Sequence, residues 1–162
     1  KNPLTIIGSS ISQVFYREIA ERTNSKTPLY PILKSILVKL LLISIPIFGG
    51  LYWAAPILFG FIFGESWTMS GKFVQALIPW FFMNFIISPV TTVPIVLNRQ
   101  GTFLIIGVIN AAITLMSIYT LWKLNFDAIT LISILSVILS LYMLLTLVWI
   151  VKISRAGVIN DI

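Results

Sequence analysis

Long uncharged stretches dominate the pattern of apolar and polar positions along the chain. They run from Lys39 to Glu65, from Lys72 to Arg99, from Arg99 to Lys123 and from Asp127 to Lys152. Each stretch exceeds the roughly 20 apolar residues with which an α-helix crosses about 30 Å of hydrocarbon. The pattern predicts an all-α, polytopic transmembrane helix bundle with four full spans, over about 36–58, 73–97, 102–122 and 129–151.

A shorter apolar run near the N-terminus predicts a partial span over about 3–23. A partial span is unusual by itself, and the first residue is Lys1 rather than Met. We therefore expect residues 1–162 to form a single transmembrane domain that is a piece of a larger protein. The alternative is that Lys1 is the end of a processed chain.

The composition also indicates a membrane protein. Of the 162 residues, 58% are hydrophobic and 10% are charged, whereas a soluble domain is about half apolar and about a quarter charged. A signal peptide does not explain this, because the apolar character continues to the end of the chain. The absence of Cys and His excludes disulfides, thiol nucleophiles and the usual transition-metal sites. We expect no metal, no cofactor and no enzymatic activity.

The distribution of Lys and Arg predicts the orientation in the membrane. One side would hold Arg17, Arg22, Lys26, Lys34, Lys39, Arg99, Lys152 and Arg155, and the other side Lys72 and Lys123 with Glu65 and Asp127. The positive-inside rule places the first side, and with it the C-terminus, in the cytoplasm. The net charge of +6 is therefore mainly a topology signal. It favours the lipid bilayer, with its anionic surface, over nucleic acid as the neighbour.

The span over 73–97 carries a polar face. Its members recur at i, i+4, i+7 and i+8, and they are Asn84, Ser88, Thr91 and Thr92. The same face leads toward Arg99. An unpaired polar group in hydrocarbon is costly, so we expect this face to meet another helix or to line a hydrated cavity. The alternative is that the hydroxyl groups only bond their own backbone.

Three prolines in this span, Pro79, Pro89 and Pro94, are candidate hinges. Pro89 cannot donate to the carbonyl of Phe85, and Pro94 cannot donate to that of Val90. We expect water, a nearby threonine hydroxyl or a neighbouring helix to satisfy these carbonyls. The alternative to a hinge role is that proline is simply commoner in membrane helices than in soluble ones.

The span over 102–122 has a second polar stripe. Asn110 is the candidate for the cavity, because an amide within a span needs a specific partner. The other members, Gly107, Thr114 and Ser117, are interpreted as close helix packing. The small polar residues of the last span, Thr130, Ser133, Ser136 and Ser140, are interpreted in the same way.

Two further regions contribute candidates. In the partial span, Gln13 and Arg17 lie on one polar face. Arg99 is suited to an anionic substrate, because its guanidinium donates two parallel hydrogen bonds to a diphosphate. The alternative is that Arg99 only determines topology and reaches lipid headgroups.

The span over 36–58 is expected to be interrupted, because it contains Pro46, Gly49, Gly50 and Pro56. The residues that follow, ILFGFIFGESW at 57–67, are expected to form a short amphipathic segment in the outer interface. Tryptophan anchors are typical of such positions.

Three segments together resemble a known family. They are GSSISQVFYREIAERT at 8–23, FGESWTMSG at 63–71 and SPVTTVPIVLNRQ at 88–100. They resemble the C-terminal half of polysaccharide-biosynthesis membrane proteins, the O-antigen and repeat-unit flippases of the multidrug/oligosaccharidyl-lipid/polysaccharide exporter superfamily. The resemblance covers roughly residues 6–155.

The resemblance implies both a fold and an activity. The chain would supply the last five helices of the C-terminal bundle in a two-bundle flippase of the bacterial plasma (inner) membrane. Such proteins move an undecaprenyl-diphosphate-linked sugar unit to the outer leaflet by alternating access. The N-terminal half of the same protein would complete the cavity. A polysaccharide polymerase and a chain-length regulator are further implied partners.

Two alternatives stay open. A drug or cation exporter of the same superfamily would be expected to carry a buried carboxylate, and the interiors of the full spans contain none. A membrane-embedded glycosyltransferase or polymerase of polysaccharide assembly would need a carboxylate or another base near the membrane surface. The acidic residues, Glu18, Glu21, Glu65, Asp127 and Asp161, form no metal-binding pattern.

Overall fold

The computed structural model describes residues 29–156. This part of the chain is helical, and four of its helical stretches are long and apolar enough to cross a membrane, Tyr30–Phe63, Glu65–Val96, Gln100–Lys123 and Ala128–Arg155. The prediction of four such helices is confirmed. The predicted partial span over 3–23, with Gln13 and Arg17, lies outside the described residues.

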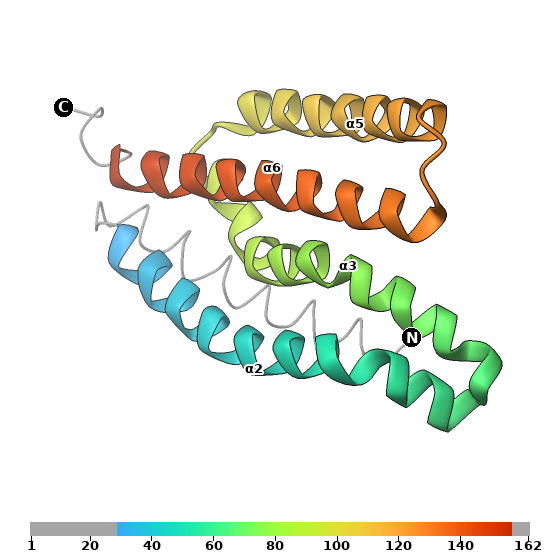
Figure 1. Cartoon of the computed structure of the whole chain (residues 1–162). Helices are drawn as coiled ribbons and strands as arrows, with labels where there is room; N and C mark the ends of the chain where they lie inside the picture. The colour runs from blue at the N-terminus through green and yellow to red at the C-terminus, as the bar shows by residue number, and fades with distance from the viewer. Residues whose placement is uncertain (1–28, 157–162) are drawn as a thin grey trace, which may run out of the picture.

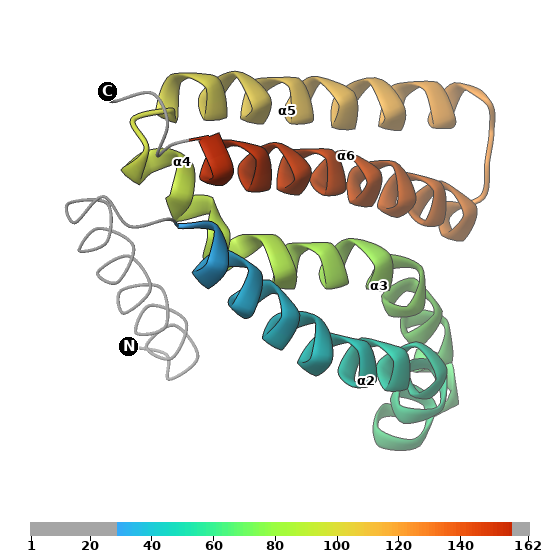
Figure 2. The same ribbon diagram turned by 90° about the vertical axis from the view of Figure 1, so that its left-hand side faces the viewer.

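The helices stack side by side in the order α5, α6, α3, α2 (Figures 1 and 2). A short helix, α4, lies at the connection between α3 and α5 (Figure 2). The elements are α2 (Tyr30–Phe63), η1 (Glu65–Trp67), α3 (Thr68–Ile87), η2 (Ser88–Thr92), α4 (Val93–Val96), α5 (Gln100–Lys123) and α6 (Ala128–Ala156), where η marks a 3₁₀-helix.

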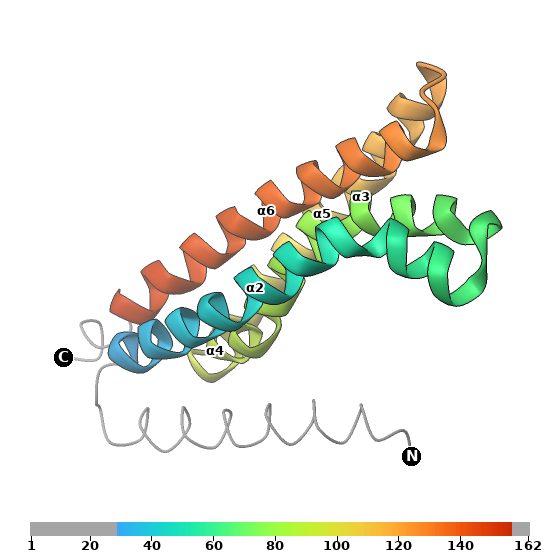
Figure 3. The same ribbon diagram turned by 60° about the horizontal axis from the view of Figure 1, so that its bottom comes forward.

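α2 is one continuous helix of 34 residues, so the predicted interruption is wrong. Pro56 lacks the N–H that would bond the carbonyl of Tyr52, and the side-chain amide of Gln75 in α3 donates to that carbonyl at 3.0 Å. The helix bends toward its C-terminal end (Figure 3). It ends at Gly64, whose φ of 96° suits glycine. Residues 57–63 therefore belong to α2 rather than to a separate interfacial segment.

α2 and α3 make their closest approach at Gly71. A Cβ atom on Gly71 would lie 2.5 Å from the Cα of Pro56 and 2.7 Å from the carbonyl oxygen of Ala55. Ala55 is fully buried. Only glycine fits at this position, so the two backbones pack in direct contact, as small residues allow in membrane helices.

α3 packs against α6 around Ser136. Ser136 is 1% exposed, and its Oγ accepts a hydrogen bond from the backbone N–H of Trp80 at 3.2 Å. The predicted packing role of Ser136 is confirmed. Pro79, one of the candidate hinges, lies inside the continuous helix α3, and the residue next to it is thus held by α6.

The second of the four long helical stretches, Glu65–Val96, changes from α-helix to 3₁₀-helix after Ile87, where α3 gives way to η2. Pro89, one of the candidate hinges, lies inside η2, and Pro94 lies in α4 directly after it; their role as hinges stays a prediction. Because a 3₁₀-helix is wound more tightly, its backbone bonds join residues three apart. The carbonyl of Val90, which Pro94 cannot bond, accepts instead from the N–H of Val93.

The threonine hydroxyls in this break do not have the partners expected from the sequence. Thr91 donates to the carbonyl of Ser88 at 2.8 Å, and Thr92 donates to that of Pro89 at 3.2 Å. Each hydroxyl thus bonds the carbonyl three residues earlier, and not a carbonyl that a proline leaves free. The local backbone bonding, considered above as an alternative, accounts for both hydroxyl protons.

The start of α2 and the end of α6 lie at the same end of the bundle. The guanidinium of Arg155 donates to the hydroxyl of Tyr30 at 2.6 Å and lies 4.1 Å from the centre of its ring. A cluster of buried apolar residues packs together at this end. Its members are Leu29, Leu33, Ile87, Val90, Val93 and Ile150.

Candidate functional site

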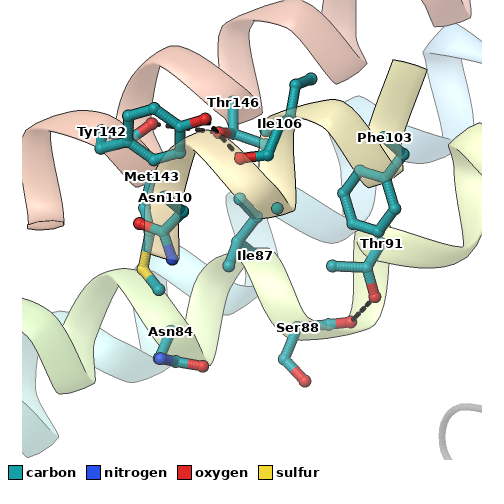
Figure 4. A pocket seen from close by; sticks show the side chains of 11 residues that line it. Asn84, Ile87, Ser88, Thr91, Phe103, Ile106, Asn110, Tyr142, Met143 and Thr146 are labelled. Carbon is teal, nitrogen blue, oxygen red and sulfur yellow. Dashed lines mark hydrogen bonds between the residues drawn. The ribbon is translucent and has the colours of Figure 1, made fainter. Parts of the chain in front are cut away.

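A pocket of about 260 Å³ lies between α3, α5 and α6 (Figure 4). Its polar lining residues come from all three helical regions and are Asn84, Ser88, Thr91, Asn110, Tyr142 and Thr146. Its apolar lining residues are Ile87, Phe103, Ile106 and Met143, with Gly107 beside them. None of these residues carries a formal charge.

The pocket lies near the middle of the helices that form it. Asn110 is about 15 Å from the start of α5, because an α-helix rises about 1.5 Å per residue. This is half of the roughly 30 Å hydrocarbon thickness of a bilayer. From Asn110 and Asn84 the lining continues to Thr91 and Phe103, which lie nearer the connection between α4 and α5.

The structure brings together four of the predicted path residues, Asn84, Ser88, Thr91 and Asn110. Thr92 is not among the lining residues, although the α-helical spacing placed it on the same face. The reason is the change to a 3₁₀-helix, in which residues three apart eclipse each other. Thr91 therefore lies in line with Ser88, and Thr92 is turned away.

Arg99 is also absent from the lining of this pocket. It is exposed in the connection between α4 and α5, and its backbone N–H donates to the carbonyl of Pro94 at 2.7 Å. The residue before it, Asn98, has a φ of 51°, which asparagine tolerates better than most residues. Arg99 thus lies at a tight turn at the end of the bundle.

Asn110 carries a polar side-chain atom that is buried in the pocket. Its Oδ1 atom is buried and has no hydrogen-bond partner among residues 29–156. Its backbone carbonyl accepts from the hydroxyl of Thr114 at 2.8 Å. A buried, unpaired acceptor is unfavourable by about 1–3 kcal/mol. The specific partner that the sequence led us to expect is therefore not supplied by the described residues.

Gly107 does not support close helix packing, contrary to the prediction. It is exposed, and a Cβ atom on it would meet nothing within 4 Å. Because Gly107 lines the pocket, its missing side chain leaves room there.

The contribution of α6 to this pocket was not predicted from the sequence. Tyr142 donates its hydroxyl proton to the carbonyl of Ile106 in α5 at 2.6 Å (Figure 4). Thr146 donates to the carbonyl of Tyr142 at 3.1 Å. A signal was present in the sequence, since Tyr142 and Thr146 are a polar pair at i and i+4 in the middle of an apolar span.

A second pocket, of about 370 Å³, lies between α2, α3 and α6 toward the other end of the bundle. Lys72, Gln75 and Ser133 are among its polar lining residues, and Tyr52 and Pro56 line it from α2. The amide of Gln75 is already bonded to the carbonyl of Tyr52, and Lys72 is exposed. The edge of this pocket at Lys72 is thus exposed.

Exposed charges gather at the two ends of the bundle, as the sequence predicted. At the end where α2 begins and α6 ends they are Lys34, Lys39, Arg99, Lys152 and Arg155, and at the opposite end Glu65, Lys72, Lys123 and Asp127. Among residues 29–156 there is no group of three or more His, Cys, Asp or Glu residues that could hold a metal ion.

Asp127 has a structural partner. Its Oδ2 accepts from the backbone N–H of Thr130 at 3.1 Å, at the N-terminus of α6. Hydrogen bonds from the side chain and the backbone of Thr130 hold the pKa of the Asp127 carboxyl below its ordinary value.

Residues 29–156 are thus helical, with four stretches long and apolar enough to cross a membrane and a pocket near the middle of these stretches, lined by uncharged polar and apolar residues. No protein-family model, no curated protein and no solved structure matches the chain.

Proposed function

We propose that this chain is the C-terminal helical bundle of a bacterial inner-membrane flippase. The flippase moves an undecaprenyl-diphosphate-linked oligosaccharide unit, of the kind used in O-antigen assembly, from the inner to the outer leaflet by alternating access. The segments at 63–71 and 88–100 support the choice of family through their resemblance to repeat-unit flippases. The N-terminal half of the same protein supplies the opposing wall.

The observation that carries this proposal is the pocket between α3, α5 and α6. It places amide and hydroxyl groups halfway along helices that are otherwise apolar, where polar groups commonly mark a substrate route. The pocket borders the point at which α3 changes to η2, and helix breaks of this kind permit bending. A polar surface next to a bendable segment suits a path that opens to each side in turn.

The size of the pocket limits the ligand that these four helices can enclose by themselves. Pockets for drug-sized ligands occupy about 300–1,000 Å³, and this pocket has about 260 Å³. It is too small for a lipid-linked oligosaccharide. The pocket therefore forms one wall of a larger route, which the other half of the flippase encloses.

The first test of this function measures lipid-linked oligosaccharide on each leaflet in cells that lack the gene. We expect complete units to accumulate on the inner leaflet and wild-type protein to clear them. Asn84→Leu is expected to slow the clearance several-fold, because it replaces an amide in the pocket. Thr114→Val is the matched control on α5, since Thr114 bonds only the backbone of its own helix.

Arg99→Ala extends the same test to the diphosphate. If Arg99 meets the anionic group on the cytoplasmic side, Arg99→Ala slows clearance, whereas Lys123→Ala at the opposite end does not. A lipid-linked unit that is shortened or never made in the deletion strain would instead identify an enzyme of assembly. That result would overturn the flippase.

The proposed orientation has its own test, because the chain contains no cysteine. An impermeant maleimide added outside intact cells is expected to label Ser66→Cys and Asn125→Cys, and not Gln100→Cys or Lys152→Cys. All four positions are exposed in the structure. The reverse pattern would place the C-terminus outside the cytoplasm.

A further inference from the structure

The hydrogen bonds in the pocket between α3, α5 and α6 leave it rich in acceptors. Thr91, Tyr142 and Thr146 each donate the hydroxyl proton to a backbone carbonyl. A hydroxyl group has one proton to donate and two lone pairs, so these three side chains offer a ligand only acceptor positions. The Oδ1 atom of Asn110 adds a buried acceptor without a partner in the described part of the chain.

Residues 29–156 give the pocket few donors and no cationic side chain. The donors that stay available are the amide NH₂ groups of Asn84 and Asn110 and the hydroxyl of Ser88. A diphosphate carries only acceptor oxygens and is held by charged donors such as Arg and Lys. The diphosphate is thus a poor fit. A bare metal cation is also a poor fit, because it requires oxygens at about 2.3–2.6 Å on every side, whereas the pocket has about 260 Å³.

The apolar part of the lining further restricts the class of ligand that fits the pocket. Ile87, Phe103 and Met143 face the same space as the two asparagines (Figure 4). A ligand that fits both parts has many hydroxyl donors around its rim and apolar C–H faces. A sugar ring has this chemistry. The pocket volume of about 260 Å³ equals that of about eight or nine water molecules at roughly 30 Å³ each, which is space for a single ring.

We propose that this pocket binds one uncharged sugar ring of the lipid-linked unit. A ring hydroxyl donates to the Oδ1 atom of Asn110, and Asn84 bonds a second hydroxyl from the opposite helix. The inference rests on the proposed function, because the flippase supplies the sugar. It adds that this pocket recognises the sugar rather than the diphosphate.

The test uses the purified full-length protein in lipid nanodiscs with two probes. One is farnesyl diphosphate linked to a single N-acetylglucosamine, and the other is farnesyl diphosphate without sugar. Wild-type protein is expected to bind the sugar-bearing probe more tightly. Asn110→Leu is expected to weaken that binding about tenfold and to leave the affinity for the sugar-free probe unchanged. A tenfold loss corresponds to about 1.4 kcal/mol.

Two further variants guard against misfolding as an explanation. Gly107→Leu keeps every polar lining group and fills the pocket, and the space around Gly107 accepts a side chain. It is expected to abolish the preference for the sugar-bearing probe. Thr114→Val, one turn beyond Asn110, is expected to preserve that preference. A thiol readout accompanies the binding data, in which the sugar-bearing probe slows maleimide labelling of Ser88→Cys and the sugar-free probe does not.

The outcomes separate this inference from the proposed function. If wild-type protein prefers the sugar-bearing probe and both pocket variants retain the preference, the pocket holds only water or lipid and the inference is overturned. Equal losses for both probes in Asn110→Leu and Gly107→Leu would also overturn it, because the diphosphate would then be the bound group. If wild-type protein binds neither probe, the flippase proposal itself fails.

Discussion

The two faces of α6 differ in how closely their neighbours approach. On one face Ser136 is buried and bonded to the backbone of α3. On the other face Tyr142 reaches across to α5, and an open pocket lies beside it. The helical stretch that includes α3 has 28% of its most apolar segment buried, whereas α5 has 6%. The same helix thus takes part in a closed interface and in an open one.

The difference follows from the size of the side chains at each interface. Glycine and serine let two helix backbones come together, as at Gly71 and Ser136, and leave no space for water. Tyr142 is longer, and its hydroxyl joins α6 to α5 across a wider gap, beside which the pocket lies. In a bilayer, where association gains little from the hydrophobic effect, the choice between small and long polar residues decides which interface is rigid and which can hydrate.

The largest effect is expected at the closed interface, from Gly71→Ala. The added Cβ would lie 2.5 Å from the Cα of Pro56, so one helix must shift, at a cost of about 1–3 kcal/mol. Gly49→Ala in α2 is the matched control, because a Cβ there meets nothing within 4 Å. Unfolding in mixed detergent micelles, followed by circular dichroism, measures both. Equal behaviour of the two variants would show that the α2–α3 contact is not tight.

A smaller effect is expected where α3 compensates for a proline of α2. Gln75→Leu removes the donor to the carbonyl of Tyr52 and is expected to destabilise the protein by about 1 kcal/mol. In a Pro56→Ala background, the restored backbone N–H bonds that carbonyl, so Gln75→Leu is expected to lose most of its effect. A double-mutant cycle from the same unfolding measurements gives the coupling. Independent, additive effects would contradict the compensation.

Sequence patterns predicted the four long apolar helices within residues 29–156 and a shared location for Asn84, Ser88 and Asn110. They did not predict the continuity of α2, because the donor that accommodates Pro56 comes from Gln75, 23 residues away. They misplaced Thr92 because α-helical spacing was applied to a 3₁₀ segment. Spacing in sequence reports the face of one helix and not the contacts that another helix supplies.

At the open interface between α5 and α6, Tyr142→Phe is expected to lower the stability modestly and to increase the access of reagents to the pocket clearly. Hydrogen bonds between membrane helices average about 0.6 kcal/mol, so losing the bond to Ile106 loosens α5 slightly. Maleimide labelling of Ser88→Cys in the pocket is expected to become faster. Tyr119→Phe is the control, because Tyr119 lies exposed on α5. Unchanged labelling in Tyr142→Phe would show that the hydroxyl does not restrict access to the pocket.

The smallest effect concerns the connection that joins the loosely packed α5 to α6. Asp127 accepts from Thr130 at the start of α6, and its pKa is lowered from 3.8 by these hydrogen bonds. A lowered pKa in the folded protein means that the ionised carboxylate stabilises the fold. This contribution is complete at pH values above the unfolded pKa, and it is lost as the pH falls through the lower folded pKa.

Asp127→Asn is therefore expected to change the acid side of the stability profile and little else. Asparagine accepts the same helix-capping bond without titrating, so the variant and the wild type should have similar melting temperatures at pH 7. As the pH falls below the unfolded pKa of Asp127, the wild type is expected to lose more stability than the Asn variant. Asp127→Ala, which lacks an acceptor, should melt lower at pH 7. If the Asn variant loses as much stability in acid as the wild type, another carboxyl group controls the response, and the α5–α6 connection owes its order to packing alone.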